Sequence, residues 1–407
     1  MVVVGSLLHL AGSVAAVEPD QPLPTIDVHG QRLVPFFNLS DSTLFTLHPY
    51  FSIAGGQDSN VLLAPSADEK SDSFVQGIIG AQIEWYPSAS DRLQLRGEYN
   101  RVHYQTYDDQ AGVRGGNLQL GFHHDDLVWA GFVIGGWTRS NDPLLGTNER
   151  ALLDAWNSEA RLDYRTLTTR SSLGATWARD NYLNDTLSFS STSRDNDRYE
   201  AYVRFAYEPS EFDSVYIRSG PTATRYDEHT QYADSNGWYG VLGSELAPSS
   251  LTTLKAEGGV VYKNYRESLP ANPSLTQHVF WGPLANLEAK YLYEEQSWIR
   301  LIGFTTLKDS LSQAYATYYV GGRLDARKRL LTNAGAIGSI DLTESFDTDA
   351  GTQARERTVL RQFRGGFDYA LREGLGLQAL AGYEFSTAQF ADDYQRWIIS
   401  ASFNAAF

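Results

Sequence analysis

Apolar and polar residues alternate along most of this chain, from about residue 45 to its end. In the clearest stretch, residues 375–385, apolar side chains occupy one face and small or polar side chains the other, with Leu380 as the exception. Alternation at period two indicates β-strands that have one apolar and one polar face. The pattern predicts strands at residues 46–56, 73–86, 92–106, 115–124, 127–138, 154–166, 170–182, 198–208, 214–226, 236–247, 251–265, 279–293, 297–308, 314–327, 333–345, 357–371, 375–388 and 394–407.

A soluble β-sandwich alternates in the same way, so the connections and the strand ends must distinguish it from a membrane barrel. Short turns, for example near residues 88–90, 168–169 and 372–374, alternate with longer loops. Aromatic residues stand at strand ends beside the short turns: Trp85, Tyr86, Tyr207, Tyr291, Tyr293, Trp298 and Tyr369. Both features are typical of outer-membrane barrels. We therefore predict an all-β fold, a transmembrane antiparallel β-barrel of about 18 strands, closed by its N- and C-terminal strands.

The amino-acid composition excludes several other classes of protein. The chain has 407 residues, 42% of them hydrophobic, and contains no run of about 20 apolar residues that could form a membrane-spanning helix. There is no Cys, which excludes disulfides and thiolate metal sites. The net charge of −16 argues against a nucleic acid partner, because phosphate binding needs clustered positive charge.

The N-terminus resembles a secretory signal peptide, with an apolar stretch from Val2 to Leu10 followed by small residues. It lacks the usual basic n-region, and a short buried helix is the alternative. We expect a signal peptide at residues 1–16, then a Pro-containing segment at 17–44 that forms a periplasmic lead-in or inserts into the pore. The transmembrane β-barrel is expected at residues 45–407.

The last predicted strand places Trp397, Phe403 and Phe407 on one apolar face, and the chain ends on that phenylalanine. A terminal Phe on an amphipathic strand resembles the assembly signal read by the barrel assembly machinery. Together with the leader and the strand pattern, it predicts the outer membrane of a Gram-negative bacterium. We expect outer-membrane lipid as a partner, and lipopolysaccharide bridged by divalent cations to the acidic loops.

The first strand carries a short motif, His48-Pro49-Tyr50-Phe51-Ser52-Ile53-Ala54, which leads into Gly55-Gly56-Gln57-Asp58-Ser59-Asn60-Val61. It resembles the opening of the beta-barrel porin-2 family. Members of that family often accompany exopolysaccharide synthesis and export operons, so the resemblance implies a polysaccharide as partner and supplies no catalytic residues. Asp58 and Asn60 are typical turn formers, and a Ca²⁺ site is the less favoured alternative.

The polar faces of the predicted strands identify the side chains that would line the lumen. The candidate selectivity residues are the basic ones: Arg92, Arg96, Arg161, Arg165, Arg204, Arg218, Lys290, Arg300, Arg323, Arg364 and Arg396. Acidic residues share these faces, with a slight basic excess overall. Two interpretations stay open: basic rings that concentrate anions, or charges that pair across neighbouring strands and stiffen the wall.

No motif indicates an enzyme, a cofactor or a metal site. The histidines show no helical metal spacing, and no nucleophile-elbow sequence is present. His123 and His124 are expected in a tight turn beside Asp125 and Asp126. The favoured function is a porin-like channel for anionic solutes or an acidic exopolysaccharide. The alternative is a docking barrel with an occluded lumen that anchors a larger envelope assembly.

Overall fold

The computed structural model describes residues 37–38, 45–64, 68–143, 150–183, 194–210, 212–228, 233–266, 278–294, 296–309, 316–347, 357–372, 374–388 and 393–406. The expected signal peptide at 1–16, the lead-in at 17–44 apart from residues 37–38, and Phe407 lie outside the described residues.

The described chain consists almost entirely of β-strands, with one short helix, α2 (Asp108–Ala111). The strands are β1 (Phe37–Asn38), β2 (Phe45–Asp58), β3 (Asp72–Trp85), β4 (Asp91–Tyr104), β5 (Val113–Asp125), β6 (Trp129–Pro143), β7 (Arg150–Arg165), β8 (Thr169–Tyr182), β9 (Asn196–Tyr207), β10 (Ser214–Tyr226), β11 (Ser235–Ser249), β12 (Thr252–Tyr265), β13 (Val279–Glu294), β14 (Ser297–Asp309), β15 (Ala316–Leu331), β16 (Ala334–Asp347), β17 (Arg357–Arg372), β18 (Leu375–Ala388) and β19 (Tyr394–Ala406). Over these ranges no helix is long and apolar enough to cross a membrane.

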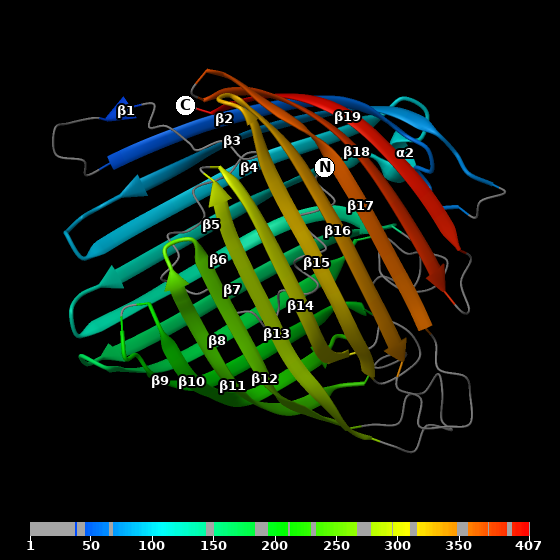
Figure 1. Ribbon diagram of the computed structural model, residues 1–407. Coiled ribbons are helices and arrows are strands. Elements are labelled where there is room, and N and C mark those ends of the chain that lie inside the picture. The colour runs from blue at the N-terminus through cyan, green and yellow to red at the C-terminus, as the bar shows by residue number, and fades with distance from the viewer. Residues whose placement is uncertain are drawn as a thin grey trace.

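The strands from β2 to β19 form one closed barrel (Figure 1). Each strand pairs antiparallel with the next along the chain, and β19 pairs with β2 from Ile398↔Asp58 to Ala406↔Tyr50. This confirms the predicted closed barrel of 18 antiparallel strands. The small strand β1 adds a short antiparallel pairing to β2 at Phe37↔Leu47. Closure pairs the first and last strands of the barrel with each other, which is what allows a β-sheet to span a membrane.

Most large apolar side chains of the strands lie on the outer face, and most polar side chains lie on the inner face. On β4, for example, Leu95 and Tyr99 are exposed while Gln94 and Asn100 are buried. Val, Ile, Tyr and Phe suit extended backbone and pack well on a pleated surface, and alternation directs them to a single face. An apolar exterior combined with a polar interior is the inverse of a soluble protein and fits a lipid environment.

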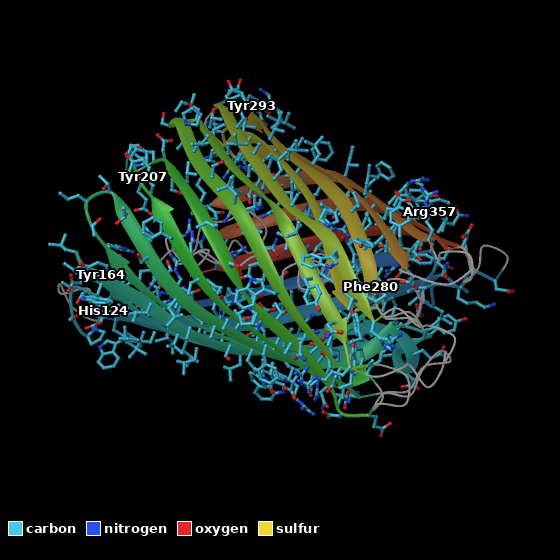
Figure 2. The ribbon with its side chains drawn as sticks, turned by 90° about the horizontal axis from the view of Figure 1, so that it is seen from below. His124, Tyr164, Tyr207, Phe280, Tyr293 and Arg357 are labelled. Atoms are coloured by element: carbon cyan, nitrogen blue, oxygen red, sulfur yellow. The ribbon has the colours of Figure 1, made fainter. Side chains whose placement is uncertain are left out.

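The two ends of the barrel differ in their connections. One end carries short turns, such as residues 166–168 between β7 and β8, and the barrel begins at Phe45 and ends at Ala406 on this same side. Figure 2 shows Tyr164, Tyr207 and Tyr293 at this end, whereas Arg357 lies at the other end, where the longer connections are. By the rule for outer-membrane barrels, the short turns are periplasmic and the long connections extracellular.

Aromatic side chains ring the periplasmic end on its outer surface. Trp85, Tyr207, Tyr291 and Tyr369 are all exposed, as a girdle at the lipid–water interface requires. The prediction that Trp298 belongs to this girdle was wrong. Trp298 alternates with exposed Ile299 and therefore lies on the inner face of β14, where the Lys290 ammonium is 5.8 Å from its ring centre. The placement of His123 and His124 in a turn was also wrong, because both lie in β5 and the turn begins at Asp126.

One pair of neighbouring strands separates before reaching the extracellular end. β13 and β14 pair only from Ala285↔Thr305 to Glu294↔Ser297. Beyond that point β13 continues to pair with β12 as far as Val279, and β14 continues to pair with β15 as far as Asp309. The ends of β13 and β14 are therefore not joined to each other by a backbone ladder, unlike the closing seam between β19 and β2.

Candidate functional site: the inner wall of the barrel

The inner wall is the candidate site, and it holds every basic residue that the strand pattern assigned to it. Each one alternates with outward-facing neighbours, as Arg161 does with exposed Leu162 and Arg218 with exposed Ile217. The set on the inner face is Arg92, Arg96, Arg161, Arg165, Arg204, Arg218, Lys290, Arg300, Arg323, Arg364 and Arg396. This alternation fixes where the side chains point; their part in selectivity stays a prediction.

Most of these cations form ion pairs within the wall. Some pair along their own strand, as Arg161 does with Asp163 and Arg323 with Asp325, each at 2.7 Å. Arg300 reaches Glu288 on the adjacent strand at 2.7 Å. Three pairs reach two strands away: Arg218–Glu257 at 3.2 Å, Arg204–Glu245 at 3.3 Å and Arg165–Asp125 at 2.6 Å. Arg96 lies 3.4 Å from Glu98. Such charges neutralise one another and hold adjacent strands together.

Three of the predicted residues differ from this pattern. Within the described ranges, Arg92, Lys290 and Arg364 form no ion pair at 4.0 Å or less. Arg364 donates to the Gln362 side-chain oxygen at 3.0 Å, and Lys290 lies 5.8 Å from the centre of the Trp298 ring. Because no carboxylate is in contact with them, their charges act more strongly on a solute than those of the paired residues.

The most buried pair closes the barrel. Arg396 on β19 is 2% exposed and Asp58 on β2 is 0% exposed. The guanidinium donates from Nε to Oδ1 at 2.9 Å and from Nη2 to Oδ2 at 2.5 Å, and the Tyr104 hydroxyl donates to Oδ2 at 3.1 Å. Arg396 was predicted only as a lumen cation, and its fixed partner was missed because Asp58 was assigned to a turn.

That turn exists as predicted. The Asn60 amide N–H donates to Asp58 Oδ1 at 3.1 Å, which is the hydrogen bond of an Asx turn. The Asn60 side chain then donates to the carbonyls of Ala64 and Gln395. Within the described part of the chain, no group of three or more His, Asp or Glu residues is arranged to hold a metal ion.

Tyrosine rings lie flat against the inner wall over glycines. Tyr50 on β2 is directly opposite Gly80 on β3, and the next residue in that row is Glu98 on β4. A β-carbon at Gly80 would collide with the Tyr50 ring, so the ring crosses β3 and its hydroxyl donates to Glu98 at 2.8 Å. A glycine thus lets one side chain tie together three successive strands.

The same arrangement recurs on the far side of the barrel. Tyr216 crosses Gly243 and donates to Glu257 at 2.8 Å. Tyr202 lies over Gly174, whose other neighbour in the row is Arg161. Rings laid along the wall occupy less of the lumen than rings pointing to its axis. Sequence reasoning missed this feature, although a Tyr and a Gly on the inner faces of adjacent strands were its visible signal.

At the extracellular end, a carboxylate orders the connection between β4 and β5. Asp108 in α2 pairs with Arg101, lies 3.0 Å from the His103 imidazole and accepts the Tyr104 amide N–H at 3.1 Å. Burial acts to raise the pKa of Asp108, but the hydrogen bonds from His103, Arg101 and Tyr104 outweigh it and lower the pKa below its ordinary value. Asp108 therefore carries its charge at neutral pH and fixes the loop.

Two of the predicted assembly residues, Trp397 and Phe403, lie on the outer face of the last strand. Trp397 is 53% exposed and packs on Tyr383 with ring centres 4.4 Å apart. Phe403 packs on Phe51 across the closing seam at 5.8 Å. Both positions face lipid, which is consistent with an exposed apolar strand face; recognition by an assembly machine stays a prediction.

Comparison with solved structures shows what this barrel is similar to. The outer membrane protein OpdK from Pseudomonas aeruginosa matches with a TM-score of 0.50 at 11% identity, covering 89% of this chain and 99% of that one. OmpF of Salmonella typhi, in complex with daunomycin, matches at 0.45 and 12% identity over 89% and 98% of the two chains. The copper transporter OprC matches at 0.47 and 11% identity over 89% and 81%.

No protein-family model matches the sequence, and a search of curated proteins finds no match. The expected membership of the beta-barrel porin-2 family therefore stays a resemblance of the first strand. The likeness to OpdK is one of fold. A closed barrel of 18 strands with an apolar exterior and a charged interior is an outer-membrane β-barrel, and the protein belongs in the bacterial outer membrane.

Proposed function

We propose that the barrel is a diffusion channel that prefers anionic solutes. The observation that carries the proposal is the inner wall, where Arg92, Lys290 and Arg364 hold charges that no carboxylate contacts in the described ranges. Barrels of about this strand number are wide enough to leave an aqueous channel. A low-dielectric wall strengthens the attraction between its cations and a passing anion.

The test is ion selectivity in planar lipid bilayers. The purified protein should conduct, and reversal potentials under a KCl gradient should show preference for chloride. The triple variant Arg92→Gln, Lys290→Gln, Arg364→Gln should shift the preference toward potassium. Arg361→Gln is the matched control, because Arg361 lies on the outer face of the same strand as Arg364 and should leave selectivity unchanged.

The finer proposal concerns cargo. The resemblance of residues 48–61 to porins that accompany exopolysaccharide operons favours an acidic polysaccharide, whose carboxylates suit bidentate arginine contacts. Polygalacturonate added to one side should then reduce chloride current at concentrations where neutral dextran of the same size does not. Equal block by both polymers would contradict recognition of acidic sugars. Absence of any conductance would instead favour the docking barrel with an occluded lumen.

A further inference from the structure

The described ends of β14 and β15 pair with each other inside the lumen and pack against the inner wall. We define the tip as residues 306–309 of β14 with residues 316–319 of β15. Along β14, Leu301 is 44% exposed on the outer face, whereas Leu307 on that same face is only 3% exposed. Leu307 continues the alternation of β14. The face of β14 that contacts lipid nearer the periplasmic end is therefore covered by protein at the tip.

The cover is the inner face of the neighbouring strands. Leu307 and Ala316 belong to one buried apolar cluster with inward-facing residues of β12 and β13, including Val261, Phe280 and Leu284. A β-carbon at Gly282 on β13 would meet the Leu307 β-carbon and the Tyr318 ring. The outer face of the tip therefore lies on the inner face of the wall, in keeping with the end of β13–β14 pairing at Thr305. Figure 2 shows Phe280 toward the extracellular end.

One carboxylate anchors the tip from several directions. Asp309 accepts hydrogen bonds from Thr224 at 2.7 Å, Ser235 at 3.0 Å, Tyr265 at 2.8 Å and the Lys263 ammonium at 2.6 Å. These donors come from β10, β11 and β12, so the last residue of β14 is held by strands two to four positions away around the barrel. Packing one sheet layer on another places them about 10 Å apart and narrows the lumen accordingly.

The other face of the tip points into the lumen, and its charges do not balance. Lys263 is neutralised by Asp309, and Arg198 on β9 donates to Asp180 at 3.1 Å. Lys308 interacts electrostatically with Arg198 and Lys263 and, less strongly, with the Asp180 carboxylate that Arg198 contacts; its ammonium lies 5.8 Å from the Tyr319 ring centre. In the described ranges Lys308 forms no ion pair within 4.0 Å, so it is the cation of the tip that no carboxylate contacts directly.

We infer that the tip is the selectivity constriction of the channel, with Lys308 as the residue that favours anions and Asp309 as the anchor that keeps the tip docked. This inference rests on the proposed channel function. Its ligand class is a small anion or a carboxylate group of a larger solute, which Lys308 meets together with the Tyr319 ring.

Docking can be tested without any transport measurement, because the chain contains no cysteine. Leu284→Cys places one thiol under the tip, and Leu292→Cys places a control thiol on the same face of β13 near the periplasmic end. Adding Asp309→Asn should accelerate labelling of the Leu284 site by a water-soluble thiosulfonate by about tenfold or more, since a charged hydrogen-bond acceptor is lost. Labelling at the Leu292 site should not change.

Selectivity is tested in the same bilayers as the proposed function. Asp309→Asn should raise single-channel conductance, and Lys308→Gln should lower chloride preference while leaving the labelling rate at Leu284→Cys unchanged. Unchanged labelling and conductance in Asp309→Asn would overturn the docked constriction. Unchanged selectivity in Lys308→Gln would overturn the role of Lys308. If neither the unmodified protein nor any variant conducts, the proposed channel function is wrong. The labelling rate at Leu284→Cys with and without Asp309→Asn still decides whether the tip is docked.

Discussion

The barrel has two contrasting junctions, the closing seam between β19 and β2 and the split between β13 and β14. At the seam, the backbone ladder continues to Asp58 at the extracellular end, where the Arg396–Asp58 pair is fully buried. At the split, the ladder stops at Thr305 and side chains fill the space instead. The comparison indicates that this barrel is closed by a continuous backbone ladder at one junction and by side-chain packing at the extracellular end of the other.

The largest effect is expected from breaking the seam. Asp58→Ala leaves the Arg396 guanidinium buried without its carboxylate, which should cost about 3–5 kcal/mol of unfolding free energy. Urea unfolding of the barrel in lipid vesicles, followed by tryptophan fluorescence, measures the loss. The control is Lys328→Ala, which removes a half-exposed ion pair with Glu294 and should cost at most about 1 kcal/mol. Similar losses for the two variants would show that the seam has no special role.

A second prediction compares glycines at the two kinds of site. Gly243→Ala drives a methyl group into the Tyr216 ring on the continuous wall and should cost about 1–3 kcal/mol. Gly282→Ala meets Tyr318 and Leu307 at the split, where the tip can move, so it should cost less stability and raise conductance. Gly258→Ala has open space around its β-carbon and is the neutral control. A larger loss at Gly282 than at Gly243 would contradict a movable tip.

The smallest effect is expected from a single hydroxyl at the split. The Tyr318 hydroxyl donates to the Trp281 carbonyl, on an edge of β13 that β14 no longer covers. Tyr318→Phe should cost about 0.5–1.5 kcal/mol and increase thiol labelling at Leu284→Cys. Tyr383→Phe, whose hydroxyl bond to Gln395 is 3.3 Å long, should change unfolding free energy by less. The reverse order would mean that the split is held mainly by apolar packing.

The architecture could be predicted from the sequence because every membrane-spanning strand of a barrel shows the same alternation of apolar and polar residues. All 18 predicted segments overlap observed strands, and the differences lie at the ends. The strand predicted at 154–166 begins at Arg150, for instance, because the ladder with β6 continues to Pro143↔Arg150. The run Ala151-Leu152-Leu153 shows no alternation of apolar and polar residues, so its backbone pairing could not be predicted from hydropathy.

The pairing of charges was beyond prediction for a different reason. Asp58 and Arg396 are 338 positions apart, and their contact depends on the register with which the barrel closes. The sequence around the tip also gives no local indication that the tip lies inside the lumen. Leu307 continues the apolar face of Ile299 and Leu301, so the sequence predicts lipid contact there, whereas the end of the β13 ladder lets this face lie against the inner face of β13 instead.

The tyrosines that cross glycines have a consequence for how the barrel is assembled. Each ring fits only when the glycine stands directly opposite the tyrosine, as Gly80 does opposite Tyr50 and Gly174 opposite Tyr202. A hairpin shifted by one residue would bring a side chain instead of the glycine under the ring and would reverse the faces of the shifted strand. The cost of such a shift arises within neighbouring strands, so it does not depend on whether β19 has already paired with β2.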